Sequence, residues 1–250
     1  MKLRWSLVIS MMSLWFAMLA ACAPAPLAGE QTTGPGEPTE AASVPPTGAP
    51  EPTPDPFPGW STYVHPATGL GFRYPSGWFG PEVYDFEGGV RIELGSDTVY
   101  PYGTGPDERQ PGAPNAYNIV IQYTLNASGW TLEQYRAGQP WLNDSLAVLE
   151  LQDGESITTA RSVTTRQRAL TVGRFTGVEF TTTLSDTAQT ERFYMRTAFL
   201  MDEGLNVLVI NGSPSNVQVT DPAAWRAAFE SIDAAKLSTF EGLVGSLQVD

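Results

Sequence analysis

The hydrophobic residues of this chain form three stretches with different patterns. Residues 5–19 read WSLVISMMSLWFAML and carry no charge, and residues 23–58 contain almost no large apolar side chain. From Trp60 onward, short apolar segments alternate with turn-forming residues. This pattern predicts a leader over residues 1–21, a linker over residues 22–58 and a single globular domain over residues 59–250.

The apolar segments of the third stretch have the period and composition of β-strands. Residues 71–75 (GFRYP) end at a proline, residues 90–94 (VRIEL) alternate strictly, and residues 118–125 (NIVIQYTL) are rich in β-branched and aromatic side chains. Short turns separate the later candidates, which favours antiparallel neighbours. These four candidate strands are residues 163–170, 178–184, 191–201 and 205–210.

Helical spacing appears between and after these strands. Thr131 is placed to cap a short helix over residues 132–139, and Asp221 caps a second helix with Pro222 in its first position. Residues 240–247 repeat the apolar spacing. We therefore predict an α+β fold, an antiparallel β-sheet flanked by helices. Its expected core comprises Phe72, Trp78, Ile119, Ile121, Phe180, Phe193, Val207, Val209, Trp225, Phe229 and Ile232.

The first stretch has the features of a secretory signal peptide. Lys2 and Arg4 precede the uncharged segment, which is short for a bilayer span, and it leads to Leu19-Ala20-Ala21-Cys22. These four residues resemble the lipobox of bacterial lipoproteins. The resemblance implies cleavage before Cys22, a diacylglyceryl group on its sulfur and a further acyl chain such as palmitate on its amine. Two or three acyl chains anchor a protein stably, so we expect it on a membrane outside the cytoplasm, at the cell surface or in the periplasm.

The second stretch has the composition of a disordered tether. Residues 23–58 hold 11 of the 21 prolines, with glycine, threonine, alanine and glutamate between them. Such a segment buries too little apolar surface to offset its ordering entropy. At about 3.1 Å per residue in the polyproline conformation, it could hold the domain on the order of 100 Å from the membrane.

Charge and residue counts exclude several kinds of site. Without the leader, 12 basic and 27 acidic side chains give a net charge of −15, which disfavours nucleic acid as a partner. Cys22 is the only cysteine and His65 the only histidine, so neither an internal disulfide nor a cysteine or multi-histidine zinc site is expected. We find no catalytic motif, metal-ligand set or cofactor motif. We expect a monomer, with a structural or solvent-facing role for His65.

Several segments resemble PsbP-like domains. Residues 70–78, LGFRYPSGW, are similar to the family's opening strand, in which an apolar strand ends in Tyr-Pro near a tryptophan. Residues 178–180, 193–194, 206–210 and 240–247 are similar to its later segments. The resemblance implies a central antiparallel sheet with flanking helices and a role in docking to larger partners, as in extrinsic photosystem II subunits. It transfers no functional residue to this chain.

One long polar segment is the candidate contact surface. Residues 95–116 separate two expected strands and carry Tyr100, Tyr102 and Arg109, residue types enriched at protein interfaces. The leading hypothesis is therefore a non-enzymatic envelope lipoprotein that docks a protein partner. The alternatives are a small-ligand or polysaccharide-binding module that uses aromatic side chains, and a hydrolase without a recognisable motif.

Overall fold

The computed structural model describes residues 55–98, 112–184 and 193–249, and these residues belong to one compact unit. Tyr100, Tyr102, Arg109, the signal peptide, Cys22 and most of the expected tether therefore lie outside the described residues. The strands and helices of the described part are β1 (Trp60–Val64), β2 (Gly71–Pro75), β3 (Phe79–Phe86), β4 (Gly89–Gly95), β5 (Ala116–Thr124), α1 (Leu132–Gly138), α2 (Pro140–Leu149), β6 (Ser156–Thr158), β7 (Ser162–Val172), β8 (Phe175–Leu184), β9 (Tyr194–Met201), β10 (Val207–Ser215), a 3₁₀ turn (Pro222–Ala224) and α3 (Trp225–Gly245).

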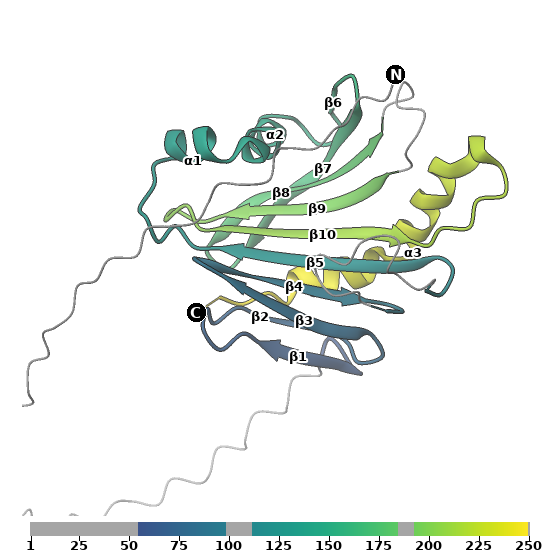
Figure 1. Ribbon diagram of the computed structural model, residues 1–250, viewed down its shortest axis with the longest axis horizontal. Coiled ribbons are helices and arrows are strands. Elements are labelled where there is room, and N and C mark those ends of the chain that lie inside the picture. Colours follow the sequence, from purple (N-terminus) through teal and green to yellow (C-terminus); the bar gives the residue numbers. More distant parts are fainter. Residues whose placement is uncertain (1–54, 99–111, 185–192, 250) are drawn as a thin grey trace, which may run out of the picture. The chain divides into compact units, whose positions relative to one another are not determined.

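Most of the strands form one antiparallel sheet. Within the described residues its order is β3-β4-β5-β10-β9-β8-β7-β6, and β1 and β2 form a separate antiparallel pair (Figure 1). The structure thus confirms an antiparallel, β-rich α+β domain with helices. Of the seven expected strands, all lie within or overlap observed ones, whereas β1, β3, β6 and α2 were not predicted.

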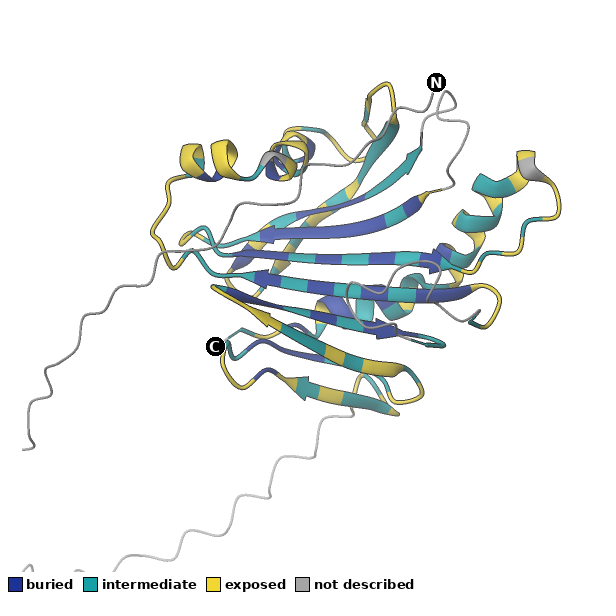
Figure 2. Cartoon of the chain, in the orientation of Figure 1, coloured by how far each residue is buried: buried dark blue, intermediate teal, exposed yellow. Residues whose placement is uncertain are grey.

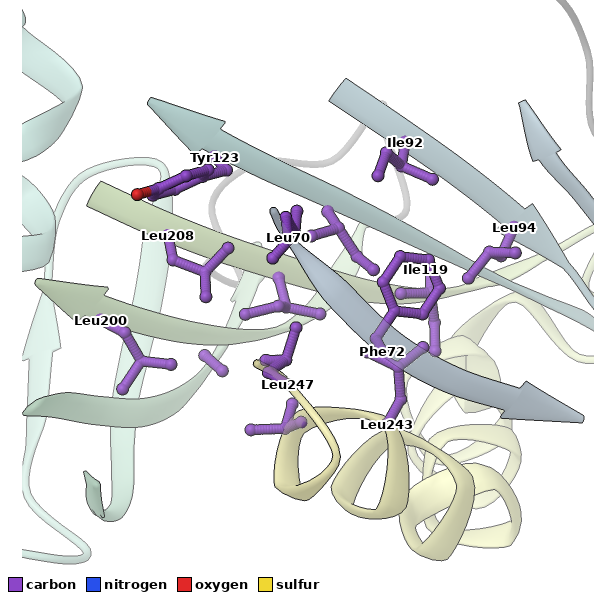
Figure 3. Packing of buried hydrophobic residues seen from close by; sticks show 14 of the residues in the cluster. Leu70, Phe72, Ile92, Leu94, Ile119, Tyr123, Leu200, Leu208, Leu243 and Leu247 are labelled. Carbon is purple, nitrogen blue, oxygen red and sulfur yellow. The ribbon is translucent and has the colours of Figure 1, made fainter. Parts of the chain in front are cut away.

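Alternation of side chains gives the sheet two buried faces (Figure 2). On one face, Ala198 and Leu200 of β9 pack in a cluster with Phe240 and Leu243 of α3, and β2 adds Phe72 to the same cluster (Figure 3). On the other face, Phe199 packs with residues of α1 and α2. The β1–β2 hairpin and α3 therefore cover one side of the sheet, while α1 and α2 cover part of the other.

The expected cap at Thr131 is confirmed, whereas Asp221 caps a short 3₁₀ turn and not α3 itself. Thr131 and Gln134 form a reciprocal capping box at the start of α1. Asp221 accepts a hydrogen bond from the Ala223 amide at 2.9 Å, and the 3₁₀ turn leads into α3. This helix has 21 residues, and the apolar segment expected at residues 240–247 belongs to it only as far as Gly245.

The expected core is confirmed in part. Phe72, Ile119, Ile121, Phe180 and Val207 are buried. The prediction was wrong for Phe193, which is exposed, and it overstated the burial of Trp78, Val209, Trp225, Phe229 and Ile232, which are only partly buried.

The position of α3 explains the overstated residues near its start. Figure 1 shows the first turns of α3 extending beyond the ends of β9 and β10, so these turns have little of the sheet to pack on. Trp225 and Phe229 instead contact each other edge to face, with ring centroids 5.6 Å apart. The buried apolar residues of α3 are Phe240, Leu243 and Val244, farther along the helix.

Candidate functional site

A cavity of about 400 Å³ lies between α2 and the face of the sheet that α2 partly covers. We call it the α2 pocket. Strands β7, β8, β9 and β10 and the short strand β6 supply its remaining walls. Its lining consists of Trp141, Asp144, Ser145, Ala147, Val148, Ile157, Thr159, Ser162, Thr164, Phe180, Thr182, Phe193, Met195, Thr197, Val209 and Asn211.

The periodicities of helix and strand bring these residues together. Trp141, Asp144, Ser145 and Val148 follow the three- and four-residue spacing of one helical face. On the strands, every second residue faces the pocket, as Phe193, Met195 and Thr197 do along and just before β9. The other face of α2 carries Leu142 and Leu146, which pack into the apolar cluster beneath α1 and α2.

Most hydroxyl groups of the lining are paired with one another. The Oγ1 atoms of Thr164 and Thr182 lie 3.1 Å apart, and Thr159 Oγ1 and Ser162 Oγ form a 3.0 Å hydrogen bond. Thr197 Oγ1 donates to Asn211 Oδ1 at 2.9 Å. Each of these bonds uses one donor and one acceptor, so the lining offers fewer uncommitted polar groups than its many threonines suggest.

Three aromatic side chains enter the pocket from separate elements. Phe180 is buried, whereas Trp141 and Phe193 are 41% and 38% exposed, among the most exposed large apolar residues of the described chain. Trp141 Nε1 donates to Gln139 Oε1 at 2.9 Å. That bond occupies the polar atom of the indole, so the ring is available for apolar contact.

The α2 pocket carries little charge. Among the described residues that line it, Asp144 is the only one with an ionisable side chain. Nucleophilic catalysis usually relies on a second ionisable group within hydrogen-bond reach of the nucleophile, and none is among the described lining residues.

A second constellation is a buried polar cluster on the opposite face, which we call the Asp233 cluster. Asp233 of α3 accepts hydrogen bonds from Tyr117 Oη at 2.7 Å and Tyr194 Oη at 2.9 Å. Arg196 Nε and Nη2 donate to its Oδ2 at 3.0 and 2.5 Å, and Arg196 Nη1 donates to Glu179 Oε1. Asp233 and Glu179 are 1% and 2% exposed.

Burial and charge set the protonation of this cluster. Burial raises the pKa of the Tyr117 and Tyr194 hydroxyls well above the ordinary value, and the Asp233 carboxylate that they face raises it further. Burial alone would lower the pKa of Arg196, but its bonds to Asp233 and Glu179 outweigh that effect and raise it. The cluster thus holds the Asp233 carboxyl between neutral tyrosines and a charged arginine, and it joins α3 to β5, β8 and β9.

His65 has a structural role, one of the two roles expected from the sequence. Its side chain is 3% exposed, with Nδ1 2.9 Å from Thr68 Oγ1 and Nε2 2.9 Å from Asp85 Oδ1. The His65 amide also donates to the Leu70 carbonyl at 2.8 Å. His65 therefore closes the turn between β1 and β2 and links that hairpin to β3.

Asp202, in the turn between β9 and β10, is also structural. Asp202 accepts from the amide and side-chain nitrogens of Asn206, at 2.9 and 2.8 Å, and from Arg174 Nε at 3.1 Å. Burial would raise the pKa of Asp202, but these hydrogen bonds lower it below its ordinary value. No group of three or more metal-binding side chains occurs among the described residues.

Comparison with known proteins does not assign the chain to a family. No family model and no curated protein matches the chain. Of the helices in the described part of the chain, none combines the length and apolar character needed to cross a membrane.

Sequence reasoning missed the α2 pocket and the Asp233 cluster for different reasons. The pocket depends on α2, which follows α1 after a single residue and was not recognised as a helix. The cluster did leave a signal. Asp233 lies seven residues before Phe240, so its acidic side chain falls on the apolar stripe of α3.

Proposed function

We propose that this protein is a lipid-anchored cell-envelope protein whose domain binds a small ligand in the α2 pocket and performs no chemistry on it. The observation that carries the proposal is the pocket itself. Its volume of about 400 Å³ lies in the range typical of small-molecule sites, and such sites are mainly apolar with a few polar groups. Partly exposed Trp141 and Phe193 offer contact area that a monomeric surface otherwise tends to bury.

The proposal changes the order of the hypotheses drawn from the sequence. A docking protein would present a flat apolar or aromatic patch, whereas a ligand-binding module would present a concave, aromatic-lined pocket. The α2 pocket matches the second description. Docking of a protein partner through Tyr100, Tyr102 and Arg109 stays a prediction, because those residues lie outside the described part of the chain.

Membership of the PsbP-like family also stays a proposal. It is supported by β2, which ends in the Tyr-Pro of the quoted motif, and by an antiparallel sheet with helices on its faces. Fold similarity of this kind would not by itself assign a ligand.

The anchor is the part of the proposal that the lipobox supports. Mass spectrometry of the mature protein should show a chain beginning at Cys22 with a lipid adduct. A Cys22→Ser variant should move from the membrane fraction to the soluble fraction. Tight membrane association of that variant after leader removal would refute the anchor and leave ligand binding untouched.

The binding proposal is tested with N-phenyl-1-naphthylamine, an uncharged dye whose fluorescence rises in apolar surroundings. The mature chain with Cys22→Ser avoids lipid and detergent. We expect saturable dye binding that Ala147→Trp abolishes. Ala147 is an exposed residue of the pocket lining, and the large tryptophan ring would fill the space that the dye needs. Ala227→Trp, at an exposed position of α3, is the matched control and should bind like the parent. Equal binding by both variants would place the dye elsewhere and overturn the proposal.

A further inference from the structure

We infer that the α2 pocket selects an uncharged, mainly apolar molecule that carries a ring, and that Asp144 discriminates against anions at this site. The inference rests on the proposed function, since it specifies the ligand of the same pocket. Three properties of the lining carry it: hydroxyls that pair with each other, aromatic walls and a single negative charge.

The hydroxyl pairs argue for an apolar ligand. Thr164 bonds to Thr182, Thr159 to Ser162, and Thr197 to Asn211. A ligand rich in hydroxyls, such as a sugar, would find few uncommitted donors here and would compete with these bonds, and each buried group left unsatisfied opposes binding. An apolar ligand leaves all three pairs intact and displaces water from the partly exposed Ile157 and Met195.

The aromatic walls argue for a ring in the ligand. Trp141 enters from α2, while Phe193 and Phe180 enter from the sheet. The Trp141 indole is fixed by its bond to Gln139, so its orientation is set before a ligand arrives. Aromatic surfaces held in this way favour flat or ring-shaped partners through stacked and edge-to-face contacts.

The charge of the lining disfavours anions. Asp144 is the only ionisable residue among the described lining residues, and neither lysine nor arginine is among them. The mature chain carries a net charge of −15, so the surrounding potential repels anions as well. A cation would gain attraction from Asp144, but that side chain is exposed to solvent on α2 and offers no buried partner for a charge in the apolar interior.

Two dyes with the same ring system isolate the charge effect. N-phenyl-1-naphthylamine is uncharged, and 1-anilinonaphthalene-8-sulfonate adds one sulfonate to it. We expect Asp144→Asn to tighten sulfonate binding about threefold to tenfold and to leave the Kd of the uncharged dye within twofold, because only the sulfonate feels the lost charge. Added salt should reduce the difference. Glu150→Gln, at an exposed acid at the end of the same helix and outside the lining, is the matched control and should leave both constants unchanged.

The outcomes separate this inference from the proposed function. If Asp144→Asn leaves sulfonate binding unchanged while Ala147→Trp still blocks both dyes, the pocket binds ligands but the charge selection is refuted. If neither dye binds the parent, both proposals fail. If a synthetic peptide of residues 23–54 displaces the uncharged dye, the pocket holds the protein's own linker, and the inference of a small ring-bearing ligand is overturned.

Discussion

At the scale of single residues, the most informative feature is an acid buried beneath a helix. Asp233 is 1% exposed, and its oxygens accept hydrogen bonds from Arg196, Tyr117 and Tyr194. A buried ion pair contributes little relative to an apolar replacement, but loss of one partner leaves an uncompensated charge. The cluster therefore fixes where α3 lies on the sheet more than it adds to overall stability.

Asp233→Asn tests this role. The substitution keeps the shape but leaves Arg196 without its main counter-charge, so the free energy of unfolding should fall by about 3 kcal/mol in urea titrations. Glu230→Gln, at an exposed acid on the same helix, should change it by less than about 0.5 kcal/mol. A loss below about 1 kcal/mol for Asp233→Asn would show that the cluster does not hold α3.

The tyrosines of the same cluster predict a loss of stability at alkaline pH. Their pKa values are raised by burial and by Asp233, so both stay neutral in the folded protein when unfolded tyrosines ionise near pH 10. The stabilisation that the two neutral tyrosines give the folded state is complete below about pH 10. It is lost as the pH rises above that value, by roughly 1.4 kcal/mol of unfolding free energy per pH unit for each tyrosine.

The measurement is the free energy of unfolding in urea between pH 8 and 11. Relative to the parent, Tyr117→Phe with Tyr194→Phe should start lower, because two hydrogen bonds to Asp233 are lost, and should decline less steeply above pH 10. The remaining slope belongs to Tyr63, Tyr123 and Tyr135, whose pKa values burial also raises. Parallel curves for parent and double variant would contradict the assignment.

At the scale of elements, the local sequence pattern predicted the positions of most strands but not the elements packed around them. β2 has the predicted bounds, and β4 and β5 coincide with alternating or β-branched segments. β3 was missed because Pro81 and its exposed residues obscure the alternation, and β6 has only three residues. α2 contains Pro140, Asn143, Asp144 and Ser145, which are weak helix formers. Its stability therefore comes from tertiary packing, which local sequence patterns do not predict.

The α2 pocket was beyond local reasoning for a related reason. Trp141 and Phe193 lie about fifty residues apart in the sequence and meet only because α2 packs on β7 and β8. Neither residue stands in a motif. Phe193 was instead assigned to the core, since an aromatic residue at the start of a strand is usually buried.

The register of α3 gives a prediction at this scale. Phe240 is 0% exposed and Phe229 is partly buried, so Phe240→Ala should cost about 3–5 kcal/mol and Phe229→Ala only about 1–2 kcal/mol of unfolding free energy. Chemical denaturation of the two variants, both Phe→Ala in one helix, compares them directly. Equal losses would mean that the first turns of α3 pack as tightly as its later turns.

At the scale of the whole molecule, the junction between linker and domain is more structured than composition suggests. Residues 55–58 fall in the segment expected to be a tether, but Asp55 and Phe57 contact the domain. The guanidinium of Arg73 pairs with both Asp55 oxygens, with Nη2 2.8 Å from Oδ2, and lies 5.3 Å from the centre of the Phe57 ring. Phe57 in turn packs on Trp60 with ring centroids 5.0 Å apart.

These contacts determine where the domain begins. A chain starting at Gly59 loses the Asp55 carboxylate and the Phe57 ring from Arg73 and Trp60, so it should melt about 2–4 °C below a chain starting at Thr53. Asp55→Asn in the longer chain should produce part of that loss.

The hydrogen bond from Arg73, then that from the Phe57 amide, lowers the Asp55 pKa to about 2. A carboxylate with a lowered pKa stabilises the fold above its ordinary pKa near 4, and that contribution is lost as the pH falls toward 2. The difference in melting temperature between the two chains should therefore become smaller below pH 4. Identical melting temperatures at neutral pH would show that residues 55–58 do not stabilise the domain and belong to the tether.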